Sequence, residues 1–365
     1  MPASADQFDF SARLLAWHRV HGRHDLPWQC SPPDPYRVWV SEIMLQQTQV
    51  ATVIPYFERF MQRFQNVQAL AAASDHEVLA LWSGLGYYQR ARNLHACAVR
   101  IVRDHGGQFP TSAQALQALP GIGRSTAAAI AASVFSERVA ILDGNVKRVL
   151  ARVTRANAPW QSPLLERLLW AEADQRLPPR SQDMPAYTQA IMDLGALVCR
   201  ARQPLCHACP VAQGCKAFAH NEVMKYPQPR KKREVPTRTA HWAVLTSDQG
   251  VWLRQQPDRG IWPGLWMPWQ LDLKALTSSW TKTVSGLREV RRIRHGFTHY
   301  RLDIEAGVIQ WEGMHPPEDA PQGLCFVPWK TALERGLPAP VRRLLLTLYP
   351  FEIKSDVESN RRSRA

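Results

Sequence analysis

Four cysteines crowded into seventeen residues constrain this chain more than any other feature. They follow the spacing Cys199-x6-Cys206-x2-Cys209-x5-Cys215, whereas the other three of the seven cysteines are scattered. Four thiolates suit either a tetrahedral zinc ion or an iron–sulfur cluster. Zinc sites usually combine two short Cys-x2-Cys pairs, but this segment has one, and its wider gaps suit a loop around a larger cluster. The pattern therefore favours a cluster over zinc, and the odd number of cysteines argues against a disulfide framework.

The positive charge of the chain is concentrated in one short segment. Lys and Arg number 45 against 31 Asp and Glu, a formal charge of +14 over 365 residues. Residues 223–240 alone carry six basic and one acidic side chain, together with three prolines. This composition predicts an extended linker, which is either a solvated tether or a tether that lies along a phosphate backbone. The surplus as a whole favours a polyanionic partner.

The sequence pattern changes across this linker. Before it, Ala-rich and Leu-rich windows repeat with helical spacing, which predicts an all-α domain over residues 1–222. After it, alternating apolar and polar runs separated by Gly and Pro predict a smaller α+β domain over 241–352, followed by a disordered tail over 353–365. The chain shows neither a secretion signal nor an apolar stretch that would span a bilayer. We therefore expect a cytoplasmic protein of two domains.

A glycine-rich turn between two predicted helices offers a contact for a phosphate group. The segment Leu119-Pro-Gly-Ile-Gly-Arg-Ser-Thr follows an amphipathic stretch and precedes an Ala-rich helix, so the whole hairpin spans about 113–135. Gly121 and Gly123 permit a tight turn, and the N–H groups of the next helix suit a phosphate oxygen. On its own the pattern fits a simple interhelical turn better. Beside the cysteine array it favours a DNA-binding hairpin.

Two carboxylates stand where a structural role competes with acid–base chemistry. Asp143 directly precedes a helix with periodic apolar residues, so we expect it to be the N-cap. Glu42 lies in the segment 36–50, and if this segment is one helix, Glu42 sits at the border of an apolar stripe. A boundary residue and a half-buried acid with a raised pKa explain Glu42 equally well.

Several motifs together resemble the MutY-type adenine DNA glycosylases of the helix-hairpin-helix, endonuclease III superfamily. They are Ser41-Glu-Ile-Met-Leu-Gln-Gln-Thr-Gln-Val50, Gly84-Leu-Gly-Tyr-Tyr-Gln-Arg-Ala-Arg-Asn-Leu-His95, the glycine-rich turn, Leu142-Asp-Gly-Asn-Val146 and the four cysteines. The similarity runs from about Leu26 to Cys215. It implies one 4Fe–4S cluster on the four cysteines. It also implies a base-excision-repair hydrolase that removes adenine mispaired with 8-oxoguanine or guanine in duplex DNA.

The resemblance gives roles to individual residues. Glu42 would protonate the purine ring, Asp143 would stabilise the oxocarbenium ion, and Asn145 would support them. Bifunctional relatives have a lysine nucleophile at the position of Ser125, which predicts a monofunctional glycosylase here. Lys147, one turn from Asp143, would give at most an adventitious adduct. The residues expected to contact DNA or to wedge into the base stack are Gln47, Tyr87, Gly121, Gly123, Arg124 and Lys147.

The carboxy-terminal part resembles the MutT-like domain of the same family, through the segments 260–268 and 295–304. Arg291 and Arg292 stand where a working Nudix hydrolase needs acids for magnesium, so the sequence predicts a domain that reads DNA without hydrolase activity. The resemblance assigns recognition of 8-oxoguanine to Phe297, Thr298 and His299, with threonine in place of the family's serine.

Two other functions compete with this interpretation. A glycosylase/lyase for pyrimidine lesions is disfavoured by Ser125 and by the second domain. A catalytically silent DNA-binding redox sensor is disfavoured by Glu42 and Asp143. We further expect a monomer associated with the bacterial nucleoid. A sliding clamp is a candidate partner, although no docking peptide for it is evident.

Overall fold

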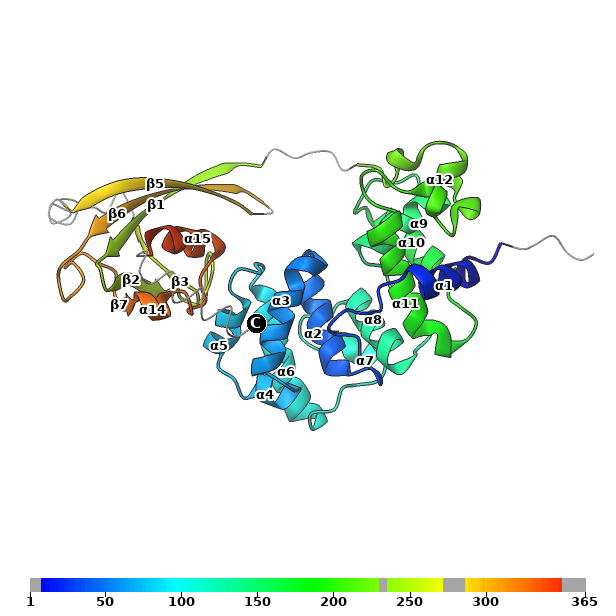
Figure 1. The fold of residues 1–365 in the computed structure, drawn as a ribbon, viewed down its shortest axis with the longest axis horizontal. Helices are drawn as coiled ribbons and strands as arrows, with labels where there is room; N and C mark the ends of the chain where they lie inside the picture. Colours follow the sequence, from blue (N-terminus) through cyan, green and yellow to red (C-terminus); the bar gives the residue numbers. More distant parts are fainter. Residues whose placement is uncertain (1–7, 230–234, 272–285, 298, 350–365) are drawn as a thin grey trace, which may run out of the picture. The chain divides into compact units, whose positions relative to one another are not determined.

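The chain divides into two compact units. The computed structural model describes residues 8–229, 235–271, 286–297 and 299–349. The first unit comprises Met1–Ala72 and Asn93–Lys232, and the second comprises Ala73–Arg92 and Arg233–Ala365 (Figure 1). The segment 73–92, predicted as part of the helical domain, therefore clusters with the carboxy-terminal unit. Within the described ranges no helix has the length and apolar character needed to cross a bilayer.

Short capped helices build the first unit. They are α1 (Phe10–His21), α2 (Pro35–Leu45), α3 (Val50–Arg63), α4 (Val67–Ala71), α7 (Ala113–Gln117), α8 (Arg124–Phe135), α9 (Gly144–Thr154), α10 (Pro163–Gln175), α11 (Met184–Asp193) and α12 (Lys216–Ala219), while α6 (Gln89–His105) has residues in both units. Asp34 and Ser162 cap α2 and α10, and a proline follows each cap at the first helical position. These side chains accept N–H groups that a helix start leaves unpaired.

The Ala-rich helix α8 lies at the centre of this unit. Residues Ala127–Ala132 of α8 are all buried, and α8 packs against α2, α7 and α11. Because most of these side chains are single methyl groups, the neighbouring helices approach α8 closely. On α2 the facing residues Trp39, Val40 and Met44 are fully buried. This packing fixes α2, and with it Glu42, against α8.

The segment 36–50 is not one helix, and the single-helix interpretation was wrong. Helix α2 ends at Leu45, Gln47 takes a left-handed φ of 57°, and α3 begins at Val50. Residues 46–49 are all polar, so a continuous helix through them would have no apolar side chain to bury at these positions. The N–H of Thr48 instead donates to the Leu45 carbonyl at 3.1 Å and closes a turn. The break presents Gln47 to solvent.

The second unit is built around a mixed sheet. Its strands are β1 (Thr237–Thr246), β2 (Gly250–Gln255), β3 (Trp266–Met267), β4 (Trp269–Leu271), β5 (Leu287–Gly296), β6 (Arg301–Gln310) and β7 (Leu324–Pro328), and its helices are α5 (Asp75–Trp82), α14 (Trp329–Ala332) and α15 (Ala339–Leu348). The strand order is β3-β2-β1-β6-β5, with β4 also paired to β1 and β7 to β2. Strands β1 and β6 are parallel and the other pairs are antiparallel.

Residues of α14 and α15 close the apolar core of this sheet (Figure 1). Trp242, Val251 and Ile304 from the strands share one buried cluster with Trp329 and Leu345 from the helices. A sheet needs such a cover because one of its faces is apolar. The expected class, an all-α domain followed by a smaller α+β domain, is confirmed.

The segment predicted as an extended linker, 223–240, is structured at both ends. Residues Val223–Lys225 form a short helical turn, and the carbonyl of Tyr226 accepts from Arg152 Nε at 3.0 Å. At the other end Thr237 begins β1. Residues 230–234 lie outside the described residues, as does the predicted tail at 353–365.

Candidate active site

Glu42 and Asp143 come together in the first unit. Glu42 is a half-buried residue of α2, and Asp143 is the half-buried N-cap of α9. Burial, together with the negative charge of Asp143, raises the pKa of Glu42 to about 7. Since a desolvated carboxyl group favours its neutral form, a large fraction of Glu42 is protonated near neutral pH. Of the two explanations offered for Glu42, the half-buried acid with a raised pKa agrees with this environment.

Asp143 has a different environment from Glu42. Its Oδ1 accepts from the Val146 N–H at 2.7 Å, which confirms the predicted cap. Burial raises the pKa of Asp143, while the N–H groups of Val146 and Asn145 and the positive charge of Arg148 act in the opposite direction. Both influences on Glu42 favour its protonated form, whereas Asp143 has donors that favour its charged form. Burial thus raises the pKa of both carboxyl groups, but only Asp143 has N–H donors and a nearby positive charge that oppose the increase.

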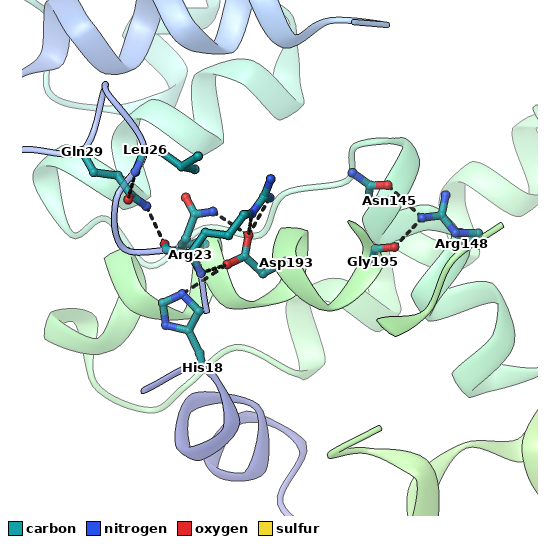
Figure 2. A network of polar contacts seen from close by, with 9 residues as sticks. His18, Arg23, Leu26, Gln29, Asn145, Arg148, Asp193 and Gly195 are labelled. Carbon is teal, nitrogen blue, oxygen red and sulfur yellow. Dashed lines mark hydrogen bonds and ion pairs between the residues drawn. The ribbon is translucent and has the colours of Figure 1, made fainter. Parts of the chain in front are cut away.

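Arg148 connects this pair to the cysteine loop and was missed by sequence reasoning. Its Nη2 donates to Asn145 Oδ1 at 2.8 Å and to the Gly195 carbonyl at 2.7 Å (Figure 2). Its Nε donates to the Cys199 carbonyl at 2.8 Å. A side chain on Gly195 is excluded because its Cβ would lie 2.6 Å from the Asn145 Cβ. The available signal was the position of Arg148, three residues after Asn145 on a helix.

A second polar network lies beside this one in Figure 2. Asp193, fully buried at the end of α11, accepts from the backbone N–H and the guanidinium of Arg23 at 2.7 and 2.6 Å. Gln189 Nε2 donates to the same carboxylate at 2.8 Å. His18 lies 3.6 Å from it. The buried Asp193 carboxylate therefore has hydrogen-bond partners, and its bonds to Arg23 fix the amino-terminal segment to α11.

Ser125 is placed to orient Asp143. Its Oγ accepts the Leu142 N–H at 3.0 Å, so α8 holds the backbone immediately before Asp143. Lys147, on the next turn of α9, directs its Nζ to Glu166 at 2.5 Å. Glu166 also accepts from the Trp170 indole at 3.2 Å. The Lys147 ammonium is therefore held by an ion pair rather than by the Asp143 carboxylate.

The glycine turn has the features of a phosphate-binding hairpin. Gly121 has a φ of 74°, and a Cβ there would lie 2.5 Å from the Asn93 Cβ. Gly123 precedes α8 without a side-chain cap and with open space around its Cα. The first N–H groups of α8 thus have no side-chain cap from this residue, which suits an anion. The guanidinium of the exposed Arg124 lies 3.7 Å from the centroid of the Trp170 ring.

The other residues expected to contact DNA divide between the units. Gln47 is exposed in the first unit. In the second unit Tyr87 has a left-handed φ of 51°, and its side chain is 52% exposed. Its neighbour Tyr88 is 8% exposed. Tyr88 therefore packs in the interior, and Tyr87 is the exposed residue of this pair.

The four cysteines line one largely apolar pocket together with Val149, Arg152 and Leu194. Burial, together with the charges of the other three cysteines, raises the pKa of the Cys209 thiol to about 12. Thiolates held this close need a positive countercharge, and Arg152 Nη1 supplies one contact to Cys199 Sγ at 3.3 Å. Among the described residues no three Cys, His, Asp or Glu converge as a single metal ion requires. Four cysteines that line one pocket are consistent with a 4Fe–4S cluster.

In the second unit, aromatic rings surround the predicted recognition loop. The Phe297 ring stacks on Tyr300 at 4.5 Å and lies 5.3 Å from the Trp262 ring. The Phe297 N–H donates to the Tyr300 carbonyl at 2.9 Å, which closes the turn, and His299 is exposed. Thr298 lies outside the described residues. Phe297 is thus part of an aromatic cluster at the end of β5.

Comparisons with known proteins agree with this organisation. Residues 40–173 match the model of the HhH-GPD superfamily base excision DNA repair proteins, and residues 240–347 match the NUDIX domain. The adenine DNA glycosylase of Buchnera aphidicola (Schizaphis graminum) is 34% identical, covering 92% of this chain and 97% of that protein. The human adenine DNA glycosylase is 35% identical, covering 86% of this chain and 69% of its own length. The structure of a thermostable thymine-DNA glycosylase matches 58% of this chain and 95% of its own, with a TM-score of 0.51 and 25% identity.

Proposed function

Because this chain belongs to the adenine DNA glycosylases of base excision repair, we propose that it removes adenine paired with 8-oxoguanine or guanine, with Glu42 as the acid and Asp143 as the stabilising carboxylate. One observation supports this most strongly. Burial and the Asp143 charge raise the pKa of Glu42 to about 7, whereas N–H donors and Arg148 on α9 oppose the effect of burial on the Asp143 pKa. Departure of a purine needs a proton donor on one side and negative charge on the other.

The reaction follows from these two environments. Glu42 donates its proton to a ring nitrogen of adenine, so that the base accepts the electron pair of the breaking N-glycosidic bond. The positive charge that develops on the deoxyribose is stabilised by the Asp143 carboxylate. Water then adds to the sugar carbon and gives up one proton, which restores Glu42. Asn145 and Arg148 hold the loop that carries Asp143.

Ser125 supports a monofunctional reaction. A hydroxyl that accepts the Leu142 N–H forms no Schiff base with the sugar. Lys147, the nearest lysine along α9, pairs with Glu166. The product is therefore an abasic site in an intact strand.

The experiment that tests this function is single-turnover release of adenine from a duplex with one adenine·8-oxoguanine pair, measured with and without alkaline strand scission. We expect rapid base release and no strand break before alkali. A strand break without alkali, at the rate of base release, would contradict the monofunctional reaction. Duplexes with adenine·thymine or a pyrimidine lesion serve as controls.

We further propose that Cys199, Cys206, Cys209 and Cys215 hold one 4Fe–4S cluster. Their shared pocket and the arginines beside Cys199 support this assignment. When bound, the cluster would supply a rigid positive core that joins the parts of the loop 199–215 through their four thiolates. Metal analysis of the purified protein should give about four iron atoms per chain and an absorption band in the visible range. Stoichiometric zinc without iron would contradict it.

The second unit is proposed to recognise 8-oxoguanine through the loop that contains Phe297, Thr298 and His299. The exposed His299 and the supported ring of Phe297 are the observations behind this role. Substitution Phe297→Ala should slow release opposite 8-oxoguanine more than release opposite guanine. Equal slowing on both duplexes would contradict a role in recognising the oxidised base.

A further inference from the structure

The segment 73–92 carries Tyr87, and it is anchored to the carboxy-terminal sheet domain of its own unit. The backbone of Leu337 forms one part of this anchor. Ser83 Oγ donates to the Leu337 carbonyl at 3.1 Å and accepts the Leu337 N–H at 3.2 Å. Tyr88 OH donates to the same carbonyl at 2.6 Å. All three residues are buried.

Close packing surrounds these hydrogen bonds. A Cβ on Gly336 would lie 3.3 Å from the Leu79 Cβ of α5. A Cβ on Gly264 would lie 2.6 Å from Arg92 Nη2, and that guanidinium donates to the Pro263 carbonyl. Two glycines thus allow two loops of the sheet domain to approach the segment 73–92. Because the hydrogen bonds are buried, loss of one partner leaves an unsatisfied polar group.

The anchored backbone fixes the conformation of the loop that presents Tyr87. The Gly84 N–H donates to Tyr88 OH at 3.2 Å, so one hydroxyl joins both ends of the loop 84–88 to Leu337. The Gly86 carbonyl accepts from the Trp82 indole at 3.0 Å and from Arg90 at 3.2 Å. Gly86 and Tyr87 have left-handed φ values of 77° and 51°. A non-glycine residue holds this conformation only when its surroundings enforce it.

The outcome is an exposed aromatic ring on a rigid loop. Tyr87 is 52% exposed, and its ring lies 5.5 Å from the Arg90 guanidinium. An enzyme that flips a base out of the duplex needs a rigid side chain to fill the gap. An exposed aromatic ring whose backbone is already fixed loses little conformational entropy on insertion.

We propose that the carboxy-terminal domain is also a positioning element for base extrusion, because Leu337 holds Ser83 and Tyr88 and thereby fixes Tyr87. This rests on the proposed function, in which Tyr87 enters the base stack. Ser83 and Tyr88 are then positioning residues that act through Tyr87. The Leu337 side chain lies in the core on which Phe297 packs, so one core supports both the recognition loop and the loop of Tyr87.

The test uses full-length protein with Ser83→Ala and Tyr88→Phe, singly and together. The matched control is Tyr349→Phe, because the Tyr349 hydroxyl is buried in the same unit and has no hydrogen-bond partner among the described residues. A duplex with one adenine·8-oxoguanine pair and a neighbouring 2-aminopurine reports unstacking by fluorescence. We expect the double variant to lose about tenfold in single-turnover release and most of the fluorescence rise, and the control to lose neither.

Repeating the Ser83→Ala and Tyr88→Phe substitutions in Tyr87→Ala protein shows whether their effect on adenine release depends on Tyr87. In Tyr87→Ala protein the double substitution should cause no further loss. An undiminished tenfold loss in that background would overturn the proposal, as would unchanged release in the double variant. If the double variant does not fold, Tyr88→Phe alone is compared with Tyr349→Phe in the same assays.

Hydrogen exchange in the absence of DNA separates this inference from the proposed function. Amides of residues 83–88 should exchange faster in the double variant than in wild type, whatever substrate the enzyme prefers. Unchanged exchange would overturn the anchoring role of Leu337. Failure of the wild-type protein to release adenine would instead contradict the proposed function, with the exchange result still valid.

Discussion

The carboxyl group of Glu42 lies close enough to Asp143 for the charge of Asp143 to raise the Glu42 pKa. The two residues come from helices far apart in the sequence, and α8 brings them together. Helix α2 packs on the Ala-rich surface of α8, and Ser125 of α8 holds the backbone before Asp143. Close packing on α8 therefore brings the carboxyl groups of Glu42 and Asp143 near each other.

The first prediction concerns the pH dependence of adenine release. The Glu42 pKa is raised to about 7, and only the protonated form donates a proton. The single-turnover rate should therefore be high below pH 7 and fall about tenfold per pH unit above it. Single-turnover assays between pH 5.5 and 9 would measure this. A rate that stays constant to pH 9 would show that Glu42 is not the acid.

The second prediction links the same residue to stability. Because the folded state raises the Glu42 pKa above its usual 4.5, the unfolded chain ionises first as the pH rises. The resulting penalty to the folded state is absent below pH 4.5, grows up to about pH 7 and is constant above it. Glu42→Gln removes it and should raise the free energy of unfolding by up to ~3 kcal/mol at pH 8.

At pH 5 this gain should shrink to less than about 1 kcal/mol. Thermal unfolding of wild type and Glu42→Gln at both pH values would measure the difference. A gain of equal size at both pH values would mean that the glutamine improves packing rather than relieving a buried charge.

The third prediction concerns Arg148. Substitution Arg148→Ala removes the donor that orients Asn145 and connects it to the Gly195 and Cys199 carbonyls. Adenine release should slow on the order of tenfold to a hundredfold, because small displacements near the reacting atoms are costly. Arg180→Ala is the control, since that exposed side chain pairs only with Asp183 among the ion pairs of the described chain. Equal rates of adenine release for Arg148→Ala and Arg180→Ala would show that Arg148 does not support the site.

The fourth prediction concerns the outcome of the reaction. Ser125→Lys places an amine beside the backbone of Leu142, next to Asp143. We expect a Schiff base with the sugar that borohydride traps covalently, together with strand breaks before alkali. The wild-type protein and Ser125→Ala should give neither signal. Trapping of wild-type protein as strong as that of the lysine variant would point to Lys147 instead.

Sequence reasoning located the main groups of the site because their local patterns carry the chemistry. Asp143 precedes a periodic helix, and its capping role followed from that position. The cysteine spacing placed four thiols in one segment, and the structure collects them around one pocket. The roles of Glu42, Asn145 and Ser125 came from resemblance, and their contacts are compatible with those roles.

Contacts between residues far apart in the sequence could not be predicted from local patterns. The role of Arg148 depends on Gly195 and Cys199, which the sequence does not place beside it. The break between α2 and α3 was missed because apolar periodicity continued across it. The grouping of residues 73–92 with the carboxy-terminal sheet depends on hydrogen bonds between Ser83 and Leu337, more than two hundred residues apart.

The measurement that tests the central claim most directly is adenine release by Glu42→Gln under single-turnover conditions. Glutamine keeps the size of the side chain and offers no acidic proton. We expect release from an adenine·8-oxoguanine duplex to fall by at least about a hundredfold, while the affinity for the uncleaved duplex stays within a few fold of wild type. Release at the wild-type rate with unchanged binding would contradict the assignment of Glu42 as the proton donor.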